Sequence, residues 1–115
     1  MKTLGELIKE LRERENLTQR KLAYELDIDV AVLSRIENEN KFPKKRIDEI
    51  ISTLSQLFDI SKEELKKIYL SDEITSILAY EENYENILKV CEEKISYTRN
   101  KNLIQTEIKF NDGSN

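Results

Sequence analysis

Carboxylates and cations are the side chains that could carry chemistry in this 115-residue sequence, because other reactive groups are scarce. The sequence contains no histidine, the commonest general base and metal ligand of proteins, and only one cysteine, Cys91. Its 23 aspartates and glutamates stand mostly among lysines, at positions expected on the solvent-facing sides of helices. We therefore interpret the carboxylates as a solvated surface and expect no enzyme activity, no cofactor and no metal site.

The composition points to a helical protein that folds around a thin core. Hydrophobic residues make up 38% of the chain and charged residues 37%, while glycine occurs twice and proline once. So few turn-forming residues disfavour an all-β fold, and the abundant leucine, isoleucine, glutamate and lysine favour helices. No run of 18 apolar residues occurs, and charge interrupts the N-terminal sequence too often for a signal peptide. We expect a cytoplasmic protein.

Hydrophobic periodicity predicts an all-α fold. The predicted helices span about residues 3–15, 19–26, 30–38, 45–58, 62–70, 72–80 and 84–98. In the tail, Ile104, Thr106, Ile108 and Phe110 alternate with polar residues, a pattern that fits a short strand or a frayed end equally well. This pattern divides the chain into a five-helix domain at residues 1–70, a helical extension at 71–99 and a tail at 100–115.

The stretch TQRKLAYELDIDVAVLSRIENE, residues 18–39, encodes two helices of barely two turns joined by a tight junction. Thr18 and Asp29 are suitable N-cap residues for the two helices. Two short helices joined in this way are what a helix-turn-helix requires, since the second helix must fit a DNA major groove about 12 Å wide.

The sequence from Leu4 to about Tyr69 resembles the lambda-repressor/Cro-type helix-turn-helix family, known as XRE. The matching residues are Arg12, LTQ at 17–19, LA at 22–23, Leu26 and Ile28, LSRIEN at 33–38 and Pro43. The resemblance implies a sequence-specific transcriptional regulator that binds a palindromic operator in double-stranded DNA as a homodimer. The helix starting near residue 29 would enter the major groove. Small restriction–modification and phage-type controllers share this size and helical plan.

The resemblance also implies a role for individual residues. Base edges would be contacted by Val30, Ala31, Ser34 and Arg35. Backbone phosphates would be contacted by Thr18, Gln19, Arg20, Asn38, Lys41, Lys44, Lys45 and Arg46. Arg12 and Glu37 would form a structural pair between the first and third helices.

The chemistry of these side chains fits the implied roles. Arg35 can make a bidentate contact to guanine, and small apolar side chains at 30 and 31 suit thymine methyl groups. These two residues could instead belong to the core, although Leu33 and Ile36 already supply its buried stripe. Likewise, the basic run KFPKKR at 41–46 could be a solvated loop.

Two features weaken the expected affinity for DNA. Asp27 and Glu39 stand where the family often has glycine, and both put negative charge near the implied DNA face. The chain as a whole carries a net charge of −4, and neither half is basic. An acidic body with a small basic face would bind random DNA poorly and depend on a matched site, which argues against a packaging role.

A dimer interface is expected in the helix near the C-terminus. Its apolar stripe consists of Tyr84, Ile87, Leu88, Cys91 and Ile95. This stripe could pack against a second copy of the chain, which we favour, or against the chain's own fifth helix. An alternative function is that of an antitoxin-like interaction module of the same family, whose C-terminal helices bind a partner protein.

Overall fold

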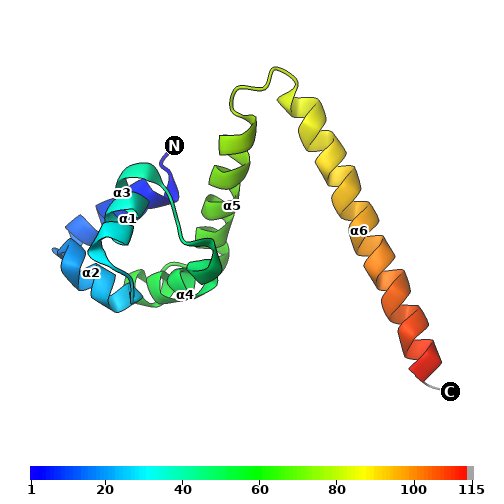
Figure 1. Cartoon of the computed structure of the whole chain (residues 1–115), viewed down its shortest axis with the longest axis horizontal. Helices are drawn as coiled ribbons and strands as arrows, with labels where there is room; N and C mark the ends of the chain where they lie inside the picture. The colour runs from blue at the N-terminus through cyan, green and yellow to red at the C-terminus, as the bar shows by residue number, and fades with distance from the viewer. Residues whose placement is uncertain (114–115) are drawn as a thin grey trace. The chain divides into compact units, whose positions relative to one another are not determined.

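The computed structural model describes the backbone of residues 1–113 and the side chains of residues 1–103. Within that range every regular element is helical, as the sequence predicts (Figure 1). The elements are α1 (Leu4–Arg14), α2 (Gln19–Leu26), α3 (Val30–Glu39), the 3₁₀ turn η1 (Lys44–Arg46), α4 (Ile47–Phe58), α5 (Lys62–Leu78) and α6 (Tyr84–Gly113). The chain forms two compact units, one from Met1 to Ile77 and the other from Leu78 onward.

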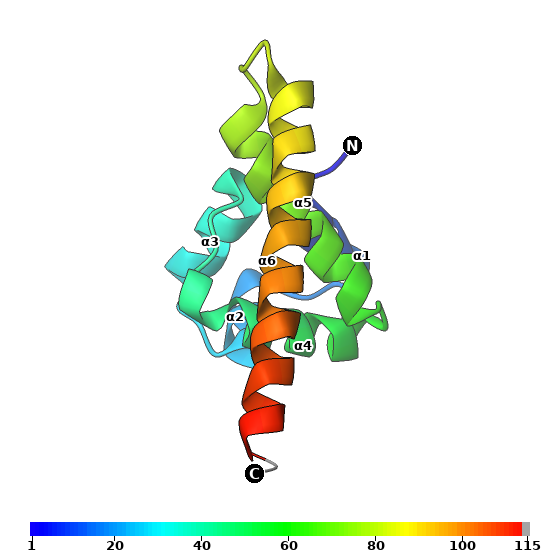
Figure 2. The same cartoon turned by 90° about the vertical axis from the view of Figure 1, so that its right-hand side faces the viewer.

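The first unit is a five-helix body with a common core, in which α1 to α4 gather beside the first part of α5 (Figure 1, Figure 2). Every one of these helices contributes to the core. Its fully buried side chains are Leu4, Ile8, Leu22, Leu33, Ile36, Ile50, Leu54 and Leu65. Full burial of one such side chain stabilises the fold by about 1.5–3 kcal/mol, so packing, rather than helix propensity, holds these short helices together. Leu57 of α4 lies outside this core and is 40% exposed.

Helices α1 and α3 approach each other closely at Gly5. A Cβ atom at this position would lie 2.0 Å from the carbonyl oxygen of Ile36, so any side chain would force the two helices apart. The glycine therefore sets how deeply α3 sits against α1.

Four connections in the first unit use aspartate or asparagine where helices commonly end in glycine. The residues with left-handed backbone are Asn16 (φ 56°), Asp27 (φ 54°), Asn40 (φ 56°) and Asp59 (φ 53°). Among non-glycine residues, these two types tolerate that conformation best. The helices can therefore end abruptly and turn back within a few residues, which keeps the α2–α3 pair compact.

One sequence prediction about the later part of the chain is wrong, and one alternative left open for the tail is not observed. The predicted break near residue 70 does not occur, because α5 runs unbroken from Lys62 to Leu78 without glycine or proline. The possible strand in the tail is a helix in its backbone, since α6 continues to Gly113. A helix satisfies its own backbone hydrogen bonds, whereas a lone strand needs a partner. The side chains of Ile104, Thr106, Ile108 and Phe110 lie outside the described residues.

The second unit consists mainly of α6, which carries exposed apolar side chains. Ile87 is half-buried, and every other described side chain of α6 is exposed. The exposed apolar members are Tyr84, Leu88, Val90, Cys91, Ile95, Tyr97 and Leu103. Of the helices described, none has the combination of length and apolar character needed to cross a membrane.

Candidate nucleic-acid interface

Helix α3 buries one face and exposes the other. Leu33, Ile36 and Glu37 point inward and are buried. On the opposite side Val30 is 41% exposed, and Ala31 and Arg35 are also exposed. Positions 31 and 35 are four residues apart, so they share one side of the helix. Three of the four residues expected to contact bases therefore face solvent, and the fourth, Ser34, is half-buried beside them.

Some polar side chains on this face form hydrogen bonds within the protein, and others do not. Asn38 Nδ2 donates a hydrogen bond of 3.1 Å to Ser34 Oγ, one helical turn back. Arg35 forms no ion pair within the described part of the chain and presents its guanidinium to solvent. A guanidinium carries five N–H donors in a planar fork, the geometry that matches two acceptors on one base.

A buried ion pair fixes the orientation of α3. The carboxylate of Glu37 is fully buried, and the side chain of Arg12 is 12% exposed. Arg12 Nε donates to Glu37 Oε2 at 2.7 Å, and Arg12 Nη2 donates to Glu37 Oε1 at 3.1 Å. The hydrogen bonds to Glu37 raise the pKa of Arg12 above its ordinary value, so the arginine stays charged throughout the physiological pH range.

The same pair reaches two further segments. Arg12 Nη1 donates to the backbone oxygen of Leu17 at 2.8 Å, and Gln19 Nε2 donates to Glu37 Oε1 at 2.9 Å. The network thus joins α1, the α1–α2 connection, the start of α2 and the buried side of α3. Gln19, expected at a phosphate, has one amide hydrogen engaged here, and its NH₂ group carries a second that can reach another acceptor.

The start of α2 is built as a helix N-terminus that can face an anion. Thr18 Oγ accepts a 3.0 Å hydrogen bond from the Lys21 backbone N–H, while the other N–H groups of the first turn lack partners within the helix. Such a terminus carries partial positive charge, which attracts phosphate. Arg20 is exposed next to it.

The lysines expected at phosphates lie in the connection between α3 and α4. Lys41, Lys44 and Lys45 are all exposed. Lys41 Nζ lies 3.6 Å from a Glu39 carboxylate oxygen, and Lys44 Nζ lies 3.9 Å from one of Glu73. Both pairs are at the surface, where such contacts contribute little and break readily.

Arg46 differs from these lysines because three of its five N–H donors are already engaged within the domain. Nη1 donates to the Asp27 backbone oxygen at 2.7 Å, Nη2 to that of Leu26 at 3.2 Å, and Nε to Glu49 at 3.0 Å. Arg46 therefore caps the C-terminal end of α2. The sequence gives no sign of this role, since the two carbonyls lie 19 and 20 residues away.

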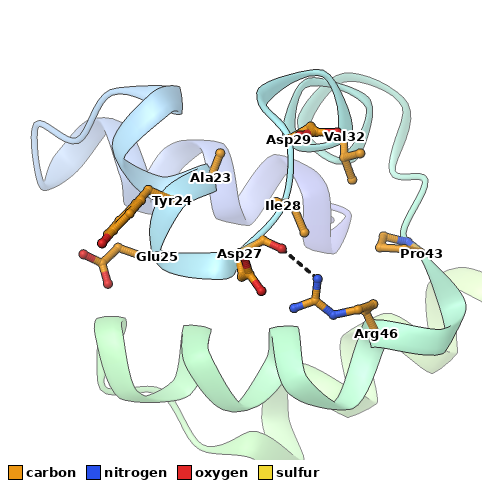
Figure 3. A pocket seen from close by; sticks show the side chains of 9 residues that line it. All are labelled: Ala23, Tyr24, Glu25, Asp27, Ile28, Asp29, Val32, Pro43 and Arg46. Carbon is orange, nitrogen blue, oxygen red and sulfur yellow. Dashed lines mark hydrogen bonds between the residues drawn. The ribbon is translucent and has the colours of Figure 1, made fainter.

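A hollow of about 780 Å³ lies beside the α2–α3 turn, where Arg46 reaches Asp27 (Figure 3). Its lining includes the acidic side chains of Glu25, Asp27 and Asp29 together with the ring of Tyr24. With three carboxylates against the one guanidinium of Arg46, the lining is negative on balance and disfavours phosphate. Within the described residues, no three histidine, cysteine or acidic side chains are grouped so as to hold a metal ion.

Comparison with protein families gives a match over more than half of the chain. A family model described as a helix-turn-helix domain matches residues 5–71. No curated protein and no solved structure matches the chain.

The buried pair gives a direct stability prediction. Arg12→Ala should lower the free energy of unfolding by about 3–5 kcal/mol, because it leaves the Glu37 carboxylate buried without its partner. The matched control is Arg14→Ala on the same helix, which removes an exposed 3.4 Å pair with Glu10 and should leave the free energy of unfolding nearly unchanged. Urea unfolding followed by circular dichroism measures both changes, and equal costs would contradict the structural role of the Arg12–Glu37 pair.

Proposed function

The chain belongs to the helix-turn-helix domain family, and from this premise we propose that it is a sequence-specific transcriptional regulator that binds double-stranded DNA. The observation that carries the proposal is the exposed face of α3, with Arg35 outward and Glu37 locked inward. In this proposal α3 enters the major groove and its outward side chains read base edges. A regulator of this kind works where the DNA is, which fits the cytoplasmic location expected from the sequence.

Base reading is assigned to the four residues on the outward side of α3. Arg35 would donate two hydrogen bonds to one guanine, and Val30 and Ala31 would contact thymine methyl groups. The Ser34 hydroxyl, held by Asn38, would act as an adaptable donor or acceptor at the next base pair.

Phosphate contacts are assigned to the two segments that flank α3. The N-terminus of α2, with Thr18, Gln19 and Arg20, would hold one phosphate. Asn38 and the exposed lysines Lys41, Lys44 and Lys45 would hold the phosphates on the other side. We propose that Arg46 supports these phosphate contacts indirectly, because its guanidinium already binds the backbone oxygens at the end of α2.

We further propose that the chain acts as a homodimer on a palindromic operator. A single DNA-binding module buries about 600–1,000 Å² of its surface on DNA, which is low for useful affinity, and two copies would read half-sites about 34–36 Å apart. The proposed dimer interface is the apolar stripe of α6, formed by Tyr84, Ile87, Leu88, Cys91 and Ile95. In proteins most helical stability comes from packing of an apolar face, so a second copy would both bury the stripe and stabilise the helix. More specifically, we propose that the chain is a controller of the restriction–modification or phage type.

Arg35→Ala should reduce binding to the preferred sequence by about 5- to 150-fold and relax the preference at one base pair of each half-site, because a bidentate contact supplies about 1–3 kcal/mol of discrimination. Selection of bound duplexes from a random pool, repeated with the variant, measures both effects. Lys62→Ala removes an equal charge from the exposed start of α5 and should leave the preference unchanged. An identical preference in wild type and Arg35→Ala would contradict base reading by Arg35.

Replacing Lys41 and Lys45 with glutamine should reduce the salt dependence of binding without changing the base preference. Each lost phosphate contact lowers the slope of log affinity against log salt concentration by about 0.9. The control is the same change at Lys66 and Lys67, which pair with Asp48 and Glu64 on the body of the domain. If the loop variant kept the wild-type slope, these lysines would not contact DNA.

Leu88→Asp should dissociate the dimer, because it places a charge in the centre of the α6 stripe. Tyr97→Asp is the control, since Tyr97 is another exposed apolar residue of α6 but lies nine positions from Leu88, on the opposite side of the helix. Sedimentation velocity should give a dimer for the wild type and the control, and a monomer for Leu88→Asp. A monomeric wild type would contradict the homodimer and favour the second candidate, an antitoxin-like module whose exposed α6 face binds a different protein.

A further inference from the structure

The end of α3 is tied to α5 through a polar cluster at the C-cap residue Asn40. Asn40 Nδ2 donates to Asp72 Oδ2 at 3.1 Å, and Asn40 Oδ1 accepts from the Gly5 backbone N–H at 2.8 Å. Asp72 Oδ2 also accepts from the Leu4 backbone N–H at 2.8 Å. Both amides belong to the first turn of α1, where N–H groups lack partners within the helix. The cluster therefore joins the C-terminal end of α3, the start of α1 and the middle of α5.

The connection that follows α3 lies along the same side of α5. The ring of Phe42 packs edge-on against that of Tyr69, with centroids 5.5 Å apart, and Lys44 pairs with Glu73. Residues 69, 72 and 73 fall on one face of a helix, so α5 holds the segment after α3 at Asn40 and at Phe42, and Glu73 on the same face lies near Lys44. This segment adjoins both the base-reading helix and the lysines assigned to phosphates.

The choice of residue at position 40 favours a positioning role. The backbone at Asn40 is left-handed, and glycine adopts that conformation with less strain than asparagine. Asparagine, however, supplies the donor and the acceptor that reach Asp72 and Gly5, which glycine cannot do. Asparagine at position 40 is therefore better explained by its hydrogen bonds to α5 and α1 than by the conformation of the turn.

We propose that Asp72 and Asn40 are positioning residues for DNA recognition, which hold the end of α3 and its phosphate-binding loop in register with α5. This inference rests on the proposed function, because the register matters only if α3 and the loop contact DNA together. Neither residue touches the DNA in this proposal. They act through the angle at which Arg35 meets its base and through the distance from α3 to the loop lysines.

The hydrogen bonds of Asp72 suggest a substitution that removes its charge and keeps both bonds. Both hydrogen bonds to this residue end on one oxygen, Oδ2. The amide oxygen of Asp72→Asn can accept both, since a carbonyl oxygen has two lone pairs, whereas Asp72→Ala removes both. Asn40→Gly removes the other half of the cluster and keeps the left-handed turn.

The first test follows amide hydrogen exchange in the full-length chain without DNA. The amides of Leu4 and Gly5 should be protected in the wild type and in Asp72→Asn. In Asp72→Ala the Leu4 amide should exchange at least about tenfold faster, and in Asn40→Gly the Gly5 amide should do so, because each loses its acceptor. Equal exchange in all four proteins would overturn the cluster itself, whatever the chain binds.

The second test measures DNA affinity and base preference for the same proteins. Asp72→Ala and Asn40→Gly should each bind the preferred duplex about tenfold more weakly with a relaxed preference, and Asp72→Asn should bind like the wild type. The double variant Asn40→Gly/Asp72→Ala should bind no more weakly than Asp72→Ala alone, because both changes break one unit.

Three results would overturn the inference. In the first, Asp72→Ala and Asn40→Gly keep the wild-type base preference and lose affinity only in proportion to their loss of thermal stability. The cluster would then have a purely structural role. Asp72→Asn could fail as badly as Asp72→Ala, which would implicate the charge instead of the hydrogen bonds. Finally, wild-type protein that selects no duplex would refute the proposed function and the inference together, whereas a selective wild type with equally selective variants would refute the inference alone.

Discussion

The arrangement of the DNA-binding domain depends on the buried ion pair between Arg12 and Glu37. A carboxylate with no solvent exposure is costly unless hydrogen bonds satisfy it, and Arg12 and Gln19 satisfy this one. Because Glu37 must point into this network, α3 can take only one rotation about its own axis. That rotation turns Arg35 outward, so the position of the proposed base-reading side chain follows from an electrostatic requirement on the opposite face.

The compactness of the domain follows from how its helices end. Aspartate and asparagine residues with left-handed backbones close the short helices, and Arg46 binds the carbonyls at the end of α2. These devices let α2 and α3 meet in a tight turn without glycine. The cost is negative charge near the turn at Asp27 and Asp29, which works against phosphate. A regulator built this way would gain little from non-specific attraction and would rely on base contacts for its affinity.

Local periodicity and capping predicted much of the domain, and long-range contacts could not be predicted. The helices from α1 to α4 follow from apolar spacing together with caps such as Thr18, because these signals lie within a few residues of each other. The inward face of α3 followed in the same way. The break near residue 70 was wrong because the apolar spacing changes there without interrupting the helix, and the Asp72 side chain bonds to α1 and α3. The backbone partners of Arg46 and the partners of Asp72 lie 19 to 68 residues away, beyond any local pattern.

Photocrosslinking can show whether the outward face of α3 lies against DNA bases, as we propose. A photoreactive benzoylphenylalanine in place of Ala31 would stand on that face, and the same residue in place of the exposed Gln56 would stand on α4. With the selected duplex, we expect crosslinks from position 31 to bases within the half-site and none from position 56. Crosslinks from position 56 alone, or equal yields from both positions, would contradict it.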